Sequence, residues 1–116
     1  MKDLSRHLEI IKTDKYEKFC VKGEVDHHTA SDIRRRIDSE IFISRPEKVL
    51  LDLSGVEFMD SSGLGLILGR YKTATELGCE FALYEPAEAA LKILKLAGCD
   101  KIIRIIRKKE TNEKIG

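Results

Sequence analysis

Short apolar runs alternate with amphipathic segments along this chain. Residues 16–22 alternate polar and apolar side chains with a period of two, and with the run at 8–13 they predict two strands joined by a turn at Asp14-Lys15. Mostly apolar runs predict three further strands at 48–53, 79–84 and 102–106. A turn at Ser54-Gly55 is expected after the first of these, followed by a short extended segment at 56–59.

The segment that follows the first two strands has apolar residues at helical spacing. A capping box of Thr29 and Asp32 is expected at its start, with Asp26 as a second candidate cap. Pro46 ends the segment. The stripe expected to face the core is Ile33, Ile37 and Ile41.

Two later segments have the same helical spacing. One opens at 60–63 and ends at Gly78, a residue suited to a left-handed C-cap. The other is expected to have Pro86 at its first helical position and Gly98 at its C-cap. Their expected core stripes are Leu64, Ile67, Leu68, Tyr71 and Ala74 in the first, and Ala87, Ala90, Leu91, Leu94 and Ala97 in the second.

The predicted order of elements is therefore β-β-α-β-α-β-α-β. Strands that alternate with helices form parallel sheets with right-handed crossovers, and the first two strands add one antiparallel pair. We therefore expect an α/β fold with a small mixed, mainly parallel sheet. A single domain is expected over 1–106, with a charged and frayed tail at 107–116.

Composition narrows the class of protein. The 116 residues include 21 Lys and Arg against 20 Asp and Glu, so a formal charge of +1 excludes a globally basic nucleic-acid binder. Aromatic residues make up 6%, too few for a platform that stacks bases. Because the chain has no run long enough to span a membrane and no signal-peptide pattern in its first residues, a cytoplasmic protein is expected. Its cysteines, Cys20, Cys79 and Cys99, are expected to be reduced thiols in or near the core.

Asp60-Ser61-Ser62-Gly63 at a helix start admits two interpretations. Serine and aspartate are favoured there because they accept hydrogen bonds from the free amides of the first turn. Alternatively, a serine is a phosphoacceptor, since a helix N-terminus favours a phosphate and the modification would leave the fold intact. Such a phosphate would change what the surface can bind.

Other chemistries find weaker support. Gly63, Gly65 and Gly69 match a dinucleotide fingerprint poorly, because the third glycine comes one residue late. Glu24 and Asp26 next to His27 and His28 suggest a metal site or a triad with Ser61, but neither a second ligand cluster nor an oxyanion motif accompanies them. The same loop could cap a helix or contact a partner, and the basic tail is expected to be a solvated end.

Two stretches carry a resemblance to a known family. Gly23-Glu24-Val25-Asp26-His27-His28-Thr29-Ala30 and the segment from Phe58 to Lys72, with its Asp-Ser-Ser-Gly-Leu-Gly sequence, resemble the STAS-domain anti-sigma factor antagonists. The Asp-His-His-Thr stretch favours the sporulation branch, which acts on the anti-sigma F factor of spore-forming bacilli. The resemblance extends to about residue 106.

The resemblance implies a STAS-type fold with helices mostly on one face of the sheet, and a regulator that is not an enzyme and needs no cofactor or metal. The unphosphorylated form would bind an anti-sigma factor that is also a serine kinase, best in its ADP state, and release sigma F in the forespore or pre-divisional cell. Phosphorylation would inactivate it, and a PP2C-type phosphatase would reverse this. Direct binding to nucleic acid or membrane is not expected.

By position, the resemblance makes Ser61 the phosphoacceptor and Ser62 its local rival. The implied kinase-binding surface comprises Glu24, Asp26, His27, Asp60, Ser62, Gly63 and Leu64. Two alternatives remain open at this point. One is an antagonist for a stress-response sigma factor, and the other is a STAS module that senses a nucleotide or lipid.

Overall fold

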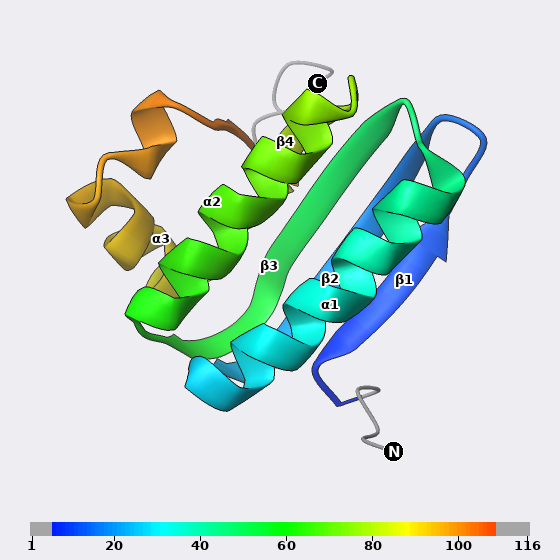
Figure 1. The fold of residues 1–116 in the computed structure, drawn as a ribbon. Coiled ribbons are helices and arrows are strands. Elements are labelled where there is room, and N and C mark those ends of the chain that lie inside the picture. Colours follow the sequence, from blue (N-terminus) through cyan, green and yellow to red (C-terminus); the bar gives the residue numbers. More distant parts are fainter. Residues whose placement is uncertain (1–5, 109–116) are drawn as a thin grey trace.

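The computed structural model describes residues 6–108 (Figure 1). The order of its elements confirms the predicted α/β alternation. Most of the proposed tail at 107–116 lies outside the described residues, and the domain limit at 106 stays a prediction. The elements are β1 (Leu8–Lys12), β2 (Tyr16–Val25), α1 (His27–Ser44), β3 (Lys48–Met59), α2 (Ser61–Glu76), β4 (Glu80–Tyr84), α3 (Glu88–Leu96), the 3-10 turn η1 (Cys99–Lys101) and β5 (Arg104–Ile106).

The five strands form one mixed sheet in the order β1-β2-β3-β4-β5. The pair β1 and β2 is antiparallel, and every other neighbouring pair is parallel. Val25 and Met59, the last residues of β2 and β3, lie opposite each other in the register. Because α1 and α2 follow directly, both helices begin at the same edge of the sheet.

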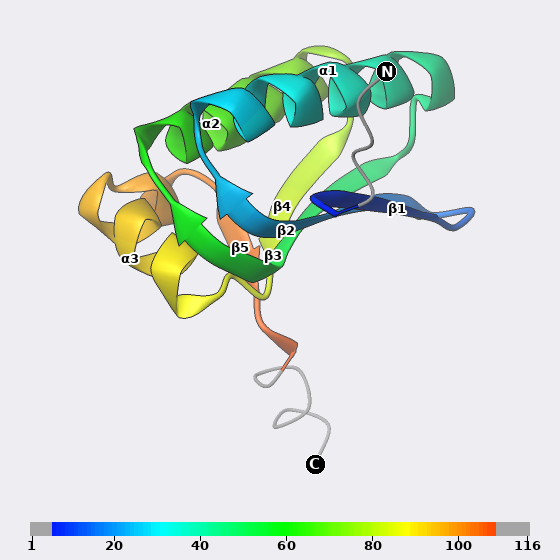
Figure 2. The same ribbon diagram turned by 90° about the horizontal axis from the view of Figure 1, so that it is seen from below.

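The helices α1 and α2 lie side by side over one face of the sheet (Figures 1 and 2). The predicted stripe of α1 is fully buried there, and the inward side chains of the strands meet it. Helix α3 packs beside β3 and joins the same core through Ala90 and Leu94. All three cysteines are free thiols, as predicted, and two of them are buried. The central buried side chains are Phe19, Ile33, Ile37, Ile41, Leu51, Ile67 and Leu83.

The structure has no turn at Ser54-Gly55, so this prediction is wrong. Strand β3 continues without interruption to Met59, and its pairing with β2 shifts register near Lys22 and again near Gly23. These irregularities take up the extra residues as a bulge would, so the strand bends and its backbone remains paired. The prediction failed because Ser-Gly favours a turn only where no neighbouring strand competes for its backbone.

The core face of α2 also differs from the prediction. Leu66 is buried, whereas Leu68 is 39% exposed, and Leu64 and Tyr71 are only partly buried. The buried face includes Arg70, whose Nε lies 2.7 Å from Oδ1 of Asp38 on α1. Because α2 packs against α1 as well as the sheet, its buried face is rotated toward α1.

Of the two candidate caps for α1, the second, Asp26, is confirmed, whereas the start of α3 and the start of β5 were placed wrongly. The capping box of α1 pairs Asp26 with Thr29, so Asp26 is the cap and Asp32 takes no part in it. Helix α3 begins at Glu88 rather than Pro86, because Ala87 is extended and its amide donates to the carbonyl of Leu53. Strand β5 begins at Arg104, after η1. In α3, Leu91 is half-buried, and Ala87 and Ala97 are cap residues outside the buried stripe.

Gly78 and Gly98 have positive φ angles, as their predicted positions after helix ends require.

Candidate functional site

The start of α1 is fixed by a reciprocal capping box. One carboxylate oxygen of Asp26 accepts hydrogen bonds from the amides of His28 and Thr29, both at 3.0 Å. The hydroxyl of Thr29 accepts in turn from the amide of Asp26 at 2.9 Å. The hydrogen bond from the Thr29 backbone is the main cause that lowers the pKa of Asp26, so this carboxylate stays charged at the helix start.

The start of α2 is built in a similar way. The carboxylate of Asp60 accepts a hydrogen bond from the amide of Ser62 at 2.8 Å, which leaves Ser61 as the first helical residue. Ser61 is exposed and Ser62 is half-buried. The amide of Asp60 donates to the carbonyl of Val25 at 3.3 Å, which ties the two helix starts together.

Gly63 sets how closely α2 approaches β3. A Cβ atom at this position would lie 2.0 Å from Cγ of Met59 and 2.6 Å from its Sδ. Met59 is itself buried, so its side chain has little room to move away. The first turn of α2, which carries Ser61, can therefore pack this closely against β3 only because residue 63 is glycine.

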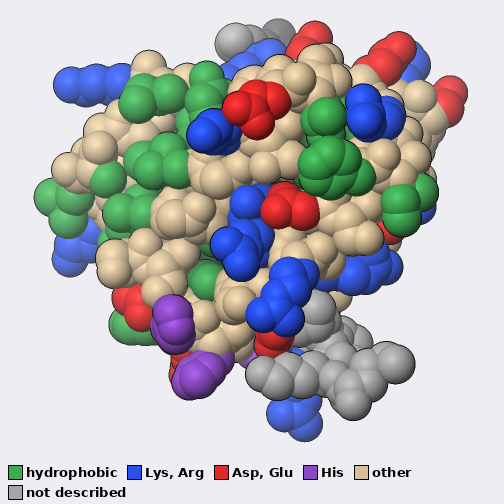
Figure 3. Space-filling model, viewed as in Figure 1, with side chains coloured by type: hydrophobic (Ala, Val, Ile, Leu, Met, Phe, Trp, Pro, Cys, Tyr) green, Lys and Arg blue, Asp and Glu red, His purple; other side chains and the backbone are tan. Residues whose placement is uncertain are grey.

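A groove of about 330 Å³ runs between the N-terminal halves of α1 and α2. His27 and Arg34 line it from α1, and Ser62, Gly65 and Leu66 line it from α2. Histidine side chains gather at the end of this face where α1 begins, and hydrophobic side chains gather on the side of α3 (Figure 3). The groove thus adjoins the turn that carries Ser61.

The sequence-predicted residues come together only in part. Asp26, His27, Asp60, Ser61 and Ser62 all lie at the two adjacent helix starts. Glu24 is exposed and faces Phe58 across the β2–β3 register, whereas Leu64 packs against the core.

Sequence reasoning missed three parts of this surface. Arg34 and Gly65 line the groove, and Phe58 is 51% exposed at the end of β3. For Phe58 the usable signal was its place in the sequence, two residues before the Asp-Ser-Ser segment. The groove residues had no such signal, because they lie about thirty positions apart in the sequence and meet only when the two helices pack.

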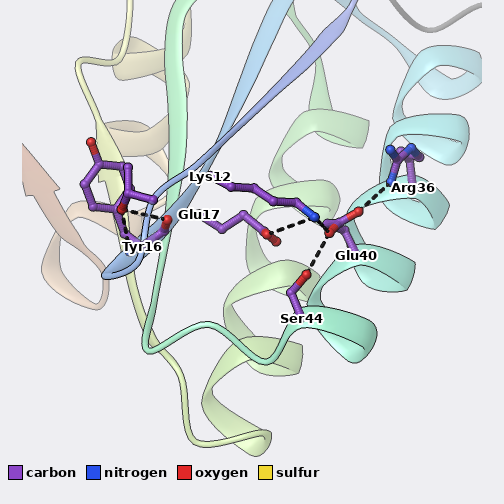
Figure 4. Close-up of polar contacts among 7 residues, drawn as sticks. Lys12, Tyr16, Glu17, Arg36, Glu40 and Ser44 are labelled. Atoms are coloured by element: carbon purple, nitrogen blue, oxygen red, sulfur yellow. Dashed lines mark hydrogen bonds and ion pairs between the residues drawn. The ribbon is translucent and has the colours of Figure 1, made fainter.

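A second polar cluster lies at the far end of α1 and fastens the β1–β2 hairpin to it (Figure 4). Glu40 accepts hydrogen bonds from Ser44 at 2.7 Å and Arg36 at 3.0 Å, and Lys12 of β1 lies 2.5 Å from it. These contacts lower the pKa of Glu40 to about 2, and the contact with Lys12 has the largest effect. Burial, with the charge of Glu40, raises the pKa of the neighbouring Glu17.

No group of three or more His, Cys, Asp or Glu side chains that could hold a metal ion occurs within residues 6–108. Nor does this part of the chain contain a helix with the length and hydropathy of a membrane span.

Comparison with known proteins places the chain in a family. The model of the STAS domain matches residues 8–112. The anti-sigma F factor antagonist of Paenibacillus polymyxa is 40% identical over 85 residues, which are 73% of this chain and 73% of that protein. The anti-sigma-B factor antagonist of Listeria monocytogenes is 31% identical over 86 residues, 73% of this chain and 74% of that one.

Solved structures agree with this placement. The anti-sigma factor antagonist SpoIIAA in its unphosphorylated form is 25% identical, with a TM-score of 0.74 over 93% of this chain and 95% of that chain. The Bacillus cell fate determinant SpoIIAA in its phosphorylated form is 24% identical, with a TM-score of 0.69 over 94% of this chain and 99% of that one. The chain therefore belongs to the STAS-domain family of anti-sigma factor antagonists.

Proposed function

We propose that this protein binds an anti-sigma factor and so frees the sigma factor that the anti-sigma factor holds, with Ser61 as the switch. The observation that carries the proposal is an exposed serine at the first position of α2, next to the capped start of α1. A partner can reach this hydroxyl without unfolding any part of the domain. The names of the relatives, all antagonists of anti-sigma factors, support the same function.

Phosphorylation of Ser61 would switch binding off through charge. A phosphoserine carries about −1.5 to −2 charges, and a helix N-terminus tolerates it because free amides and the helix dipole face it. The domain would therefore stay folded while a charge appears in the interface beside Asp60. Burying an unpaired charge there would weaken binding by a few kcal/mol. Each step of about 1.4 kcal/mol corresponds to a tenfold loss of affinity. SpoIIAA is known in a phosphorylated form, which supports such a switch.

The partners follow from the same proposal. The anti-sigma factor is a serine kinase that binds the unphosphorylated protein best with ADP, and with ATP it phosphorylates Ser61 and lets go. A PP2C-type phosphatase resets the serine. The sigma factor released is sigma F, in the cytoplasm of a forespore or pre-divisional cell, and the 40% identity to an anti-sigma F factor antagonist favours it.

The test is phosphorylation of the purified protein by the candidate kinase with ATP, followed by phosphopeptide mass spectrometry. Ser61→Ala is the test variant and Ser62→Ala is the matched control. We expect loss of the phosphate in the first only, and stable co-purification of Ser61→Ala with the kinase in ADP and in ATP. Ser61→Asp should fold but bind poorly. A phosphate on Ser62 in the wild-type protein would refute the assignment.

A second candidate target is the anti-sigma factor that controls sigma B, because an anti-sigma-B factor antagonist is 31% identical to this chain. Parallel binding assays with the two anti-sigma factors separate the candidates. Tighter binding to the sigma-B regulator would replace sigma F in the proposal and leave the role of Ser61 untouched.

A further inference from the structure

The lining of the groove between α1 and α2 carries a positive charge. Arg34 is exposed and lines the groove together with His27, and none of the described residues that line it is an acid. The two nearby carboxylates, Asp26 and Asp60, are engaged with amides of the helix starts. The groove therefore offers a positive charge to whatever enters it.

A buried ion pair, Arg70 with Asp38, lies beside the groove and adds no net charge to it. Arg70 is buried beside the groove-lining Leu66, whose carbonyl accepts a hydrogen bond from it, and its ion-pair partner is Asp38. Burial lowers the pKa of Arg70, the charge of Asp38 opposes this, and the charge of Arg34 adds to the lowering. The guanidinium groups of Arg34 and Arg70 thus repel each other, and an anion next to Arg34 would reduce that repulsion.

The floor of the groove is shaped for close approach. Gly65 lies inside α2, where glycine lowers helix stability relative to alanine. Its φ is not positive, and a Cβ atom there would meet nothing within 4 Å. Neither backbone conformation nor packing within the molecule requires glycine at this position, so the backbone of α2 is open to close approach there. Gly69 has the same open space, but only Gly65 lines the groove.

We propose that this groove receives an acidic side chain of the anti-sigma factor, which pairs with Arg34 while the partner's backbone lies against Gly65. The inference rests on the proposed function and extends its interface from the helix starts onto the flanks of α1 and α2. The groove is continuous with that surface, because Ser62 lines it and is the neighbour of Ser61. A partner that reaches the Ser61 hydroxyl therefore comes close to the groove.

The test is the affinity of purified variants for the anti-sigma factor with ADP, measured by titration calorimetry. Arg34→Glu is the test variant, and Arg35→Glu is its matched control, because Arg35 carries the same charge on the same helix without lining the groove. We expect at least about tenfold weaker binding for Arg34→Glu and a change within about twofold for Arg35→Glu. Gly65→Met, which fills the groove without changing charge, should also weaken binding. Thermal unfolding confirms that each variant is folded.

The outcomes separate the two claims. Equal losses for Arg34→Glu and Arg35→Glu would mean general electrostatic attraction and would overturn the inference, as would wild-type affinity in Arg34→Glu and Gly65→Met. Failure of the wild-type protein to bind the anti-sigma factor would overturn the proposed function and this inference together. Inorganic phosphate is the probe for the free protein, read from the Ser62 and Gly65 amide resonances. Saturable shifts that are lost in Arg34→Glu would support Arg34 as the anion partner, whereas shifts that persist in Arg34→Glu would place the anion at the helix start and overturn the inference.

Discussion

Three glycines of α2 allow the packing of the Ser61 turn to be tested by one type of substitution. In three single variants, Gly63, Gly65 or Gly69 is replaced by alanine, which is more favourable in a helix than glycine by about 1 kcal/mol. At Gly65 and Gly69 the new methyl group meets nothing within 4 Å. Both substitutions are therefore expected to stabilise the protein by about 0.5–1 kcal/mol each.

Gly63→Ala should have the opposite sign. Its methyl group would stand 2.0 Å from Cγ of Met59, far inside contact distance, and Met59 is only 3% exposed. Overpacking a buried site costs about 1–3 kcal/mol, and a clash this close belongs at the upper end of that range. After the gain in helix propensity, a net loss of about 1–2 kcal/mol remains.

Thermal and urea unfolding measure the effect. At about 2.1 cal/mol/K of unfolding entropy per residue, a chain of 116 residues changes its Tm by about 4 °C for each kcal/mol. We expect a decrease of about 4–8 °C for Gly63→Ala and an increase of about 2–4 °C for Gly65→Ala. Adding Met59→Ala removes the clashing atoms, so the double variant should be more stable than the sum of the two losses. A higher Tm for Gly63→Ala, or strict additivity with Met59→Ala, would refute the steric argument.

Two further predictions concern α1. Asp26→Ala removes the N-terminal cap and should lower the free energy of unfolding by about 0.5–2 kcal/mol in urea titration, whereas Asp26→Asn, which keeps an accepting oxygen for the same amides, should change it little. The pKa of Glu40 is lowered from 4.5 to about 2 in the folded state, so its stabilising contribution is present above pH 4.5 and is lost as the pH falls through about 2. Urea titrations between pH 7 and 2 should therefore show a weaker acid dependence for Glu40→Gln than for the wild-type protein, and an unchanged dependence would contradict the ion-pair interpretation.

Local patterns determined much of this protein in advance. The order of strands and helices, the left-handed glycines at 78 and 98, and the buried isoleucine stripe of α1 follow from periodicity and from backbone preferences that act over a few residues. The same short range explains why the exposed serine at the start of α2 could be singled out, since helix starts have a recognisable composition.

Tertiary contacts decided the remainder. The Ser54-Gly55 turn does not form because the backbone of β3 pairs with β2 on both sides of these residues. Leu66 replaces Leu68 in the core, and Arg70 is buried, because α2 packs against α1 as well as the sheet. The groove with Arg34 and Gly65 exists only because parallel pairing of β2 and β3 sets two helices side by side. A sequence pattern specifies which residues share a face of one helix, but the neighbour that this face meets depends on the packing of the whole chain.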